Sequence, residues 1–311
     1  MQPSTQRMSY PKDAFYPASW ALKAAKAYGN GVVDITPKAK EKQYNKGIYL
    51  SIRWNITAPT HGADGFFTLR DVPILHGAAN INDPSDRRVK DKTERYLSFS
   101  TTVLGDFGEF LKIVSPICVA KLEALKASGK FVTSSIKPLL RTHISDTCAD
   151  VSLRGKALDH PVFDIGFDWD TYPATHFKKN LAGKPKMLIF DADKPVLDDD
   201  GNQKKDDQGN LLYHPATVMV GDVEQNVCAA TQHLFITDNS VAVVMDIRLD
   251  SCFVNKNQAS IPDRFTTLVI RKGKAGAVVR IDENAELNML DVDNTPPKKV
   301  VDAGDPTLKL D

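Results

Sequence analysis

The sequence predicts an α+β fold, a mostly antiparallel β-sheet or small β-barrel with inserted and flanking helices. Three observations predict it. Several segments alternate apolar and polar residues, which is typical of half-buried strands. One long segment, residues 106–130, repeats apolar residues at helical spacing instead. Strand-like segments lie on both sides of it, and neither an internal repeat nor a Pro/Gly/Ser-rich linker divides the chain, which favours one domain.

We expect this domain to lie between two irregular ends. Residues 1–17 contain three prolines and no apolar periodicity, which predicts a flexible N-terminal segment. Residues 18–286 hold all the strand-like and helix-like segments and form the single domain. Residues 287–311 again lack periodicity and are acidic, which predicts a disordered acidic tail.

The domain opens with a short helix and an amphipathic strand. The segment "SWALKAAKAYG", residues 19–29, predicts a helix that is capped by Ser19 and stopped by Gly29. In "GIYLSIRWNIT", residues 47–57, every second side chain is apolar, so one face of the strand enters a core. The other face carries Tyr49 and Arg53, a ring and a guanidinium on the same side.

The segment "FFTLRDVPI", residues 66–74, predicts a second strand with the same arrangement. Phe67 and Leu69 share its core face, while Phe66, Thr68 and Arg70 share the other. On both strands an aromatic residue precedes an arginine by four positions. We expect these two strands to be neighbours and to form one exposed face of rings and guanidinium groups.

The remaining segments complete the predicted fold. A polar loop leads to a short strand at 96–100, and the 106–130 helix ends at Gly129. Further elements are a shorter helix at 134–145, strands at 160–170 and 186–197, a segment at 223–235 that is helical at its start, a hairpin of 233–237 with 241–255, and strands at 264–272 and 275–282.

Charge is nearly balanced overall but unevenly distributed along the chain. The formal net charge is +1, so a nucleic-acid site would have to arise from local clusters of basic side chains. Residues 7–53 carry nine basic and three acidic side chains, and residues 282–311 carry eight acidic and three basic ones. This asymmetry predicts a polyanion-binding N-terminal part and an acidic C-terminal tail, although both ends could equally be solvated surface.

Composition and cysteine spacing predict a soluble, intracellular protein. The chain is 42% hydrophobic and 25% charged, which is typical of globular domains. Its four cysteines lie far apart and form no CxxC pair, so reduced and mostly buried thiols are expected instead of disulfides or a zinc site. We find neither the apolar core of a signal peptide nor a segment of transmembrane length.

Two motifs suggest other chemistry. "LIFDADKPVL" resembles the first motif of haloacid-dehalogenase-type phosphatases, with Asp191 and Asp193 as nucleophile and general acid, but Pro195 stands where that motif has Thr. "DDDGNQKKDDQGN" lacks the acidic residue that a calcium loop needs five positions before its glycine. We therefore predict no enzyme, no cofactor and no metal, and keep a phosphate-cleaving enzyme as a rival hypothesis.

The two opening strands point to single-stranded nucleic acid. A ring can stack on any base, and a neighbouring cation can meet the phosphate. Lysines before the first strand and a basic loop after the second would extend the surface electrostatically. The predicted binding residues are Lys42, Lys46, Tyr49, Arg53, Phe66, Arg70, Arg87, Arg88, Lys90, Lys92 and Arg95. The alternative is that the rings pack under other elements and the arginines pair with acids.

The order of segments over residues 20–255 resembles the single-stranded-DNA-binding proteins of nucleocytoplasmic large DNA viruses. The resemblance lies in "KGIYLSIRWNI", "AKLEALKASGK", "SSIKPLLRTHIS", "HPVFDIGFDWD", "MLIFDADKPVLDDDG" and "HLFITDNSVAVVMDIRLDSCFVNK", in that order. It implies an OB-fold-like core with added helices and sequence-independent binding of single-stranded DNA or RNA. It also implies a role in viral genome replication, recombination or repair, in the replication compartment of the host cytoplasm or nucleus.

A second class of function stays open. A virion or scaffold structural protein could use the same exposed rings as a protein interface. Its binding would be less sensitive to salt than that of a DNA-binding protein.

The acidic tail generates a testable prediction. A negative segment tethered near a cationic surface competes with nucleic acid at high effective concentration, and recruits replication proteins that recognise it. Deleting residues 288–311 should therefore tighten single-strand binding, most of all at low salt, where attraction is least screened. Fluorescence titration at several salt concentrations measures this, and equal affinity of the two proteins at low salt would exclude the competition.

Overall fold

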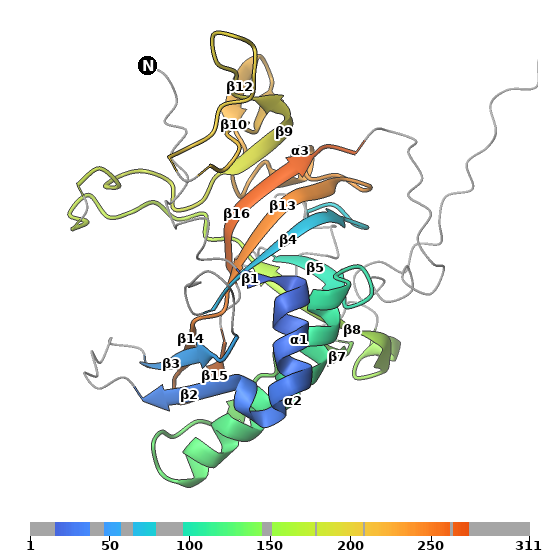
Figure 1. Ribbon diagram of the computed structural model, residues 1–311, viewed down its shortest axis with the longest axis vertical. Coiled ribbons are helices and arrows are strands. Elements are labelled where there is room, and N and C mark those ends of the chain that lie inside the picture. The colour runs from blue at the N-terminus through green and yellow to red at the C-terminus, as the bar shows by residue number, and fades with distance from the viewer. Residues whose placement is uncertain are drawn as a thin grey trace, which may run out of the picture.

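Two β-sheets that share one hydrophobic core form the frame of the protein (Figure 1). The structure is a computed structural model. It describes residues 16–37, 47–56, 65–78, 96–144, 151–177, 179–207, 209–261 and 264–273. Strands outnumber helices in these ranges, so the predicted α+β class is confirmed.

The larger sheet has nine strands and mixed direction. Its main path runs β1 (Tyr16–Pro17), β4 (Phe66–Pro73), β13 (Val241–Arg248), β16 (Arg264–Arg271), β8 (Ala157–Gly166) and β5 (Tyr96–Ser100). Off this path, β9 (Ile189–Pro195) pairs with β16 and with β10 (Tyr213–Pro215), and β7 (Arg141–His143) pairs with β8. The central pairs β4–β13 and β13–β16 are antiparallel, whereas β16 runs parallel to β8 and β9.

The smaller sheet has five strands and lies beside the helices in the lower half of Figure 1. Its order is β2 (Val33–Pro37), β3 (Ile48–Trp54), β14 (Ser251–Val254), β15 (Gln258–Ser260) and β6 (Ser135–Ile136). All pairs are antiparallel except β15–β6. A separate hairpin is made by β11 (Thr217–Val220) and β12 (Val223–Asn226).

Two helices cover the core beside the smaller sheet (Figure 1). They are α1 (Ala18–Tyr28) and α2 (Asp106–Ala127), and they pack on each other. The shorter helical turns are η2 (Gly29–Val32), η3 (Val151–Leu153) and α3 (Gln232–Phe235). Helix α2 contacts both β2 and β6, the two edge strands of the smaller sheet. In the parts of the chain that the structure describes, the helices are too short or too polar for a membrane span.

Aromatic rings join the two sheets and α2. Trp54 of β3 meets Phe67 of β4 edge-on, with ring centroids 5.6 Å apart, and Phe110 of α2 contacts both rings at 5.3 Å. All three side chains are buried. The indole Nε1 of Trp54 donates a 2.7 Å hydrogen bond to the carbonyl oxygen of Leu249, so its polar atom is satisfied inside the core.

Leu249 lies at a corner where the chain passes from one sheet to the other. Strand β13 ends at Arg248 in the larger sheet, and β14 begins at Ser251 in the smaller one. Only Leu249 and Asp250 separate them. The amide nitrogen of Ile52 in β3 donates to the carbonyl oxygen of Asp250 at 3.1 Å, which fixes the second residue of the corner as well.

Most of the strongly periodic segments form the predicted elements. Strands β3, β4, β5, β8, β9 and β16 and helices α1 and α2 fall within the predicted ranges or overlap them closely. Phe67 and Leu69 enter the core as predicted. Ser19 is not the cap of α1, because the helix already begins at Ala18, directly after Pro17, and no side chain caps it. Tyr16 and Pro17, placed in the flexible segment, form β1 and pair with β4.

Three predicted elements are wrong. Residues 134–145 contain β6 and β7 instead of a helix, and Pro138 between them disfavours a continuous helix. The start of 223–235 is strand β12, and its end is the short helix α3, so no hairpin joins 233–237 to β13. The long strand predicted at 241–255 is two strands, β13 and β14, in different sheets. The strand predicted at 275–282 and the tail at 287–311 lie outside the described residues.

The packing of α2 generates a stability prediction. A Cβ at Gly108 would overlap the backbone carbonyl of Thr101, which cannot move without disturbing the turn before the helix. Gly108→Ala should therefore destabilise the fold by about 1–3 kcal/mol, as overpacking does. Gly31→Ala is the matched control, because a Cβ there meets only the side chain of Tyr28 at 4.0 Å. Chemical denaturation of both variants measures the difference, and equal stability would contradict this account of the helix start.

Candidate nucleic-acid interface

The larger sheet turns one face toward the aromatic core and the other away from it. Strand β13 pairs with β4 without a register shift and with β16 across two shifts, and the paired outward side chains form rows across the sheet. The first row crosses five strands: Phe66 of β4, Arg248 of β13, Arg264 of β16, Gly166 of β8 and Tyr96 of β5 are successive register partners. We call these five residues the arginine row.

The arginine row has two neighbouring guanidinium groups, Arg248 and Arg264, with an aromatic ring at each end of the row. The Cζ atom of Arg248 lies 5.8 Å from the ring centroid of Phe66, within the range of a cation–π interaction. The guanidinium of Arg248 also forms a 2.7 Å ion pair with Asp250. With strands about 4.8 Å apart, the row spans about 19 Å from Phe66 to Tyr96.

Gly166 lets two side chains of the row come together. A Cβ at this position would overlap Nη1 of Arg264 and would lie 3.1 Å from Cε1 of Tyr96. The guanidinium and the phenol ring therefore lie side by side over the backbone of β8. Both are accessible, and Tyr96 is 38% exposed.

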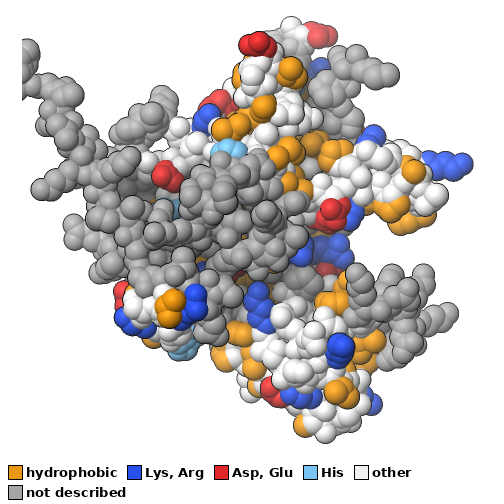
Figure 2. Space-filling view, turned by 180° about the vertical axis from the view of Figure 1, so that it is seen from behind, with side chains coloured by type: hydrophobic (Ala, Val, Ile, Leu, Met, Phe, Trp, Pro, Cys, Tyr) orange, Lys and Arg blue, Asp and Glu red, His pale blue; other side chains and the backbone are white. Residues whose placement is uncertain are grey.

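Tyr96 and Arg264 line a cleft of about 350 Å³ at the junction of the two sheets. The other basic side chains on its walls are Lys137, Arg141 and His143. Figure 2 shows Lys and Arg side chains in a hollow between the upper and lower parts of the molecule. Several cations on the walls of one cleft attract a polyanion more strongly than the net charge of +1 suggests.

Asp164 is the one carboxylate among the described residues that line this cleft. Its Oδ2 accepts a 3.1 Å hydrogen bond from Nε of Arg141, and its Oδ1 accepts one from the Ser98 hydroxyl at 2.5 Å. The carboxylate is thus engaged within the sheet. Among the described residues that line the cleft, three cationic side chains, Lys137, Arg141 and Arg264, stand against this one carboxylate, so the walls carry a positive net charge.

The predicted face of Tyr49, Arg53, Phe66 and Arg70 is not one surface. Tyr49 and Arg53 lie on β3 of the smaller sheet, and Phe66 and Arg70 lie on β4 of the larger sheet, so the two strands are not neighbours. Periodicity predicted which side of each strand faces outward. It could not show that β13, close to 180 residues later in the sequence, is the neighbour of β4.

Each of these four residues has its own surroundings. Phe66 is only 6% exposed, with Arg248 over its ring, so the prediction of an exposed stacking ring is wrong. Tyr49 is partly exposed and packs on Phe253 of β14, with ring centroids 5.1 Å apart. Arg53 is exposed and lines a groove with Lys121, whose Nζ lies 3.8 Å from Oδ1 of Asp34. Arg70 is exposed and lines a second cavity on the outer face.

Seven predicted binding residues lie outside the described residues: Lys42, Lys46, Arg87, Arg88, Lys90, Lys92 and Arg95. The structure identifies four further candidate binding residues that the sequence did not indicate, namely Tyr96, Lys137, Arg248 and Arg264. An available signal was that Arg248 and Arg264 each stand at the end of a strongly apolar strand, where the side chain reaches the rim of a sheet.

Asp191 and Asp193, the two aspartates of the segment that resembles a phosphatase motif, interact with other groups of the protein. Oδ1 of Asp191 accepts a hydrogen bond from the backbone nitrogen of Asp193 at 3.0 Å, which is a local turn. Asp193 pairs with Arg271 of the neighbouring strand at 3.4 Å. Within the described ranges, no three His, Cys, Asp or Glu side chains gather in a way that could hold a metal ion.

No known protein-family model matches the chain, and no curated protein matches it either. The assignment of the candidate interface is therefore supported by the positions and chemistry of its residues.

The cysteines generate a prediction about reactivity. Burial raises the pKa of the thiols of Cys118 and Cys252 to about 12, so both stay protonated at pH 8, whereas Cys228 is exposed. Because the thiolate is the nucleophile, iodoacetamide at pH 8 should modify Cys228 in the folded protein and leave Cys118 and Cys252 unmodified. Peptide mass spectrometry reads out each site, with urea-unfolded protein as the control in which all four cysteines of the chain react, these three included. Fast native labelling of Cys118 would contradict the buried arrangement.

Proposed function

We propose that this protein binds single-stranded nucleic acid without sequence preference, along the arginine row and the adjoining cleft. The observation that carries the proposal is the pair of Tyr96 and Arg264, side by side over Gly166 in a cleft whose exposed charges are mainly basic. A ring of this kind stacks on a base, and the guanidinium beside it meets a phosphate.

The arrangement explains why binding would be sequence-independent. Every base has a π face, so stacking on Tyr96 does not distinguish one base from another. Arg264 and Lys137 offer cations to the backbone, and backbone contacts carry no sequence information. The cleft is lined by residues of both sheets, so a bound strand would contact both.

An OB-like core is part of this proposal. The smaller sheet has five strands, the number found in an OB-fold barrel. Its two edge strands, β2 and β6, both contact α2, an arrangement that a sheet curled against the helix would produce. The topology of a complete barrel is an inference from these contacts and from the resemblance to viral single-stranded-DNA-binding proteins.

The same resemblance supplies the biological setting that we propose. A protein of this kind would protect and organise single strands while a viral genome is replicated, recombined or repaired inside the host cell. Binding of this type needs no catalytic residue and no cofactor, since stacking and ion pairing supply the free energy.

A scaffold role is the second candidate, and one observation favours it. Hairpin β11–β12 carries exposed apolar side chains at its tip, Met219, Val220 and Val223. Exposed apolar groups in a cluster are typical of protein contacts. Such contacts depend weakly on salt, which separates this hypothesis from binding to a polyanion.

The stacking part of the proposal predicts a large effect of Tyr96→Ala. Loss of the ring should weaken binding of a fluorescent oligo(dT) by about 1–3 kcal/mol. Tyr28→Ala is the matched control, because Tyr28 is 51% exposed on α1 and does not line the cleft. If both variants bind like the parent, the stacking platform is not at Tyr96.

The electrostatic part is tested by Arg264→Ala over a series of salt concentrations. Removing one phosphate contact should reduce the slope of log affinity against log salt by about one. Arg154→Ala removes an exposed arginine that does not line the cleft and serves as the control. A parent protein whose oligonucleotide binding is absent, or is unaffected by salt, would support the scaffold hypothesis instead.

A further inference from the structure

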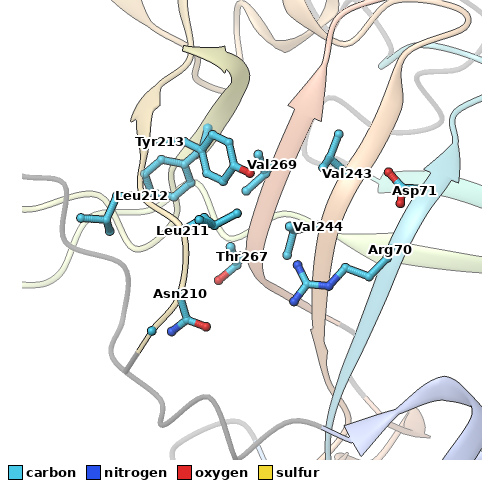
Figure 3. A pocket seen from close by; sticks show the side chains of 12 residues that line it. Arg70, Asp71, Asn210, Leu211, Leu212, Tyr213, Val243, Val244, Thr267 and Val269 are labelled. Atoms are coloured by element: carbon cyan, nitrogen blue, oxygen red, sulfur yellow. The ribbon is translucent and has the colours of Figure 1, made fainter. Parts of the chain in front are cut away.

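A second cavity lies on the same outer face as the arginine row. It is lined by β4, β13, β16 and β9 on one side and by the segment leading into β10 on the other, and its volume is about 300 Å³ (Figure 3). This is the lower end of the range for small-ligand pockets. Its floor is another cross-strand row, in which Arg70, Val244, Val269 and Phe190 are successive register partners.

The cavity is apolar at its floor and polar at its edges. Val244, Val269 and Phe190 form a buried cluster apart from the main core, with Tyr213 packed against it. Figure 3 shows Leu211 and Tyr213 on one side of the space and the Arg70 side chain reaching into it from the other, past Val244 toward Thr267. Flat apolar walls with an aromatic ring suit a planar heterocycle.

Asn210 supplies a hydrogen-bonding edge. Its Nδ2 donates to Oδ2 of Asp206 at 2.9 Å, and its backbone nitrogen donates to Oδ1 of the same residue at 2.8 Å. The side chain is therefore held in place, with its amide oxygen left to accept a hydrogen bond. A group positioned in this way can read the edge of a base that has left the stack.

Arg70 supplies the charge. No ion pair to its guanidinium occurs among the described residues, and Asp71, the acid that also lines the cavity, lies farther out beside Val243 in Figure 3. An arginine at the rim of an apolar cavity suits a ligand with a planar body and an anionic end. A nucleotide has both parts.

The spacing connects this cavity to the arginine row. Arg70 follows Phe66 by four residues on β4, and Val244 precedes Arg248 by four on β13, so the two rows lie about 13 Å apart on one face. Stacked nucleotides rise about 3.4 Å each, so roughly four of them would cover that distance. The row between them is Thr68, Asp246 and Thr267.

We propose that this cavity receives one base of the bound strand, with its phosphate on Arg70, its faces against Tyr213 and Val244, and its edge at Asn210. This inference rests on the proposed function, since the strand reaches the cavity from the arginine row. An alkyl carboxylate would also satisfy Arg70 and the apolar floor, but it would leave the polar edge at Asn210 unmatched.

The test uses 2-aminopurine deoxyriboside monophosphate as a fluorescent mononucleotide, followed by anisotropy. Leu211→Trp should fill the cavity from its rim and weaken this binding by about tenfold or more, as should Arg70→Ala. The matched controls are Leu197→Trp and Arg154→Ala, which should stay within roughly twofold of the parent. Leu197 is 50% exposed and Leu211 45%, each forms an isolated β-bridge, and Leu197 does not line the cavity. Thermal melting verifies that all four variants are folded.

The outcomes separate this inference from the proposed function. The base pocket is overturned if the parent protein binds oligo(dT) but not the mononucleotide. It is also overturned if mononucleotide binding is unchanged in Leu211→Trp and Arg70→Ala. Neither result contradicts strand binding at the arginine row. Saturable mononucleotide binding without oligo(dT) binding supports the pocket and contradicts the proposed function. Displacement of the probe by dodecanoate but not by deoxyadenosine monophosphate would assign the cavity to an alkyl carboxylate and overturn the proposal.

Discussion

The contact between Trp54 and Phe67 is the interaction on which the rest of the structure depends, because it fixes the two sheets against each other. The two rings meet edge-on, and their buried position removes a large apolar area from water. The indole also donates to Leu249, at the corner between β13 and β14. Every surface built from both sheets, including the cleft at Tyr96 and Arg264, takes its shape from this junction.

Local periodicity predicted the elements that bury one face. In β3 and β4 the alternation of side chains follows directly from the pleat, so Trp54, Phe67 and Leu69 could be assigned to the core from the sequence. Helix α2 was equally clear, since its apolar residues recur at 3.6-residue spacing over 22 residues. The outward direction of Arg53 and Arg70 followed from the same rule.

Strand partners could not be predicted in this way, and they determine the candidate site. Tyr96, Gly166, Arg248 and Arg264 come from four separate parts of the chain and meet only through register. Strands β3 and β4 have similar patterns of apolar and polar residues, but such a pattern does not show which sheet each strand joins. The short strands β6 and β7 were missed because each has only two or three residues and is stabilised by its neighbours and not by its own pattern.

The two-residue corner at Leu249 and Asp250 affects how the surface around Arg248 would bind a ligand. Both corner residues are hydrogen-bonded to β3, so the end of β13 that carries Arg248 is already held before a ligand arrives. A surface of this kind loses little conformational entropy on binding, because its backbone is ordered in advance. The association rate of such a ligand would then depend on long-range electrostatic attraction and on its orientation at the surface. No slow rearrangement of the sheets would have to come first.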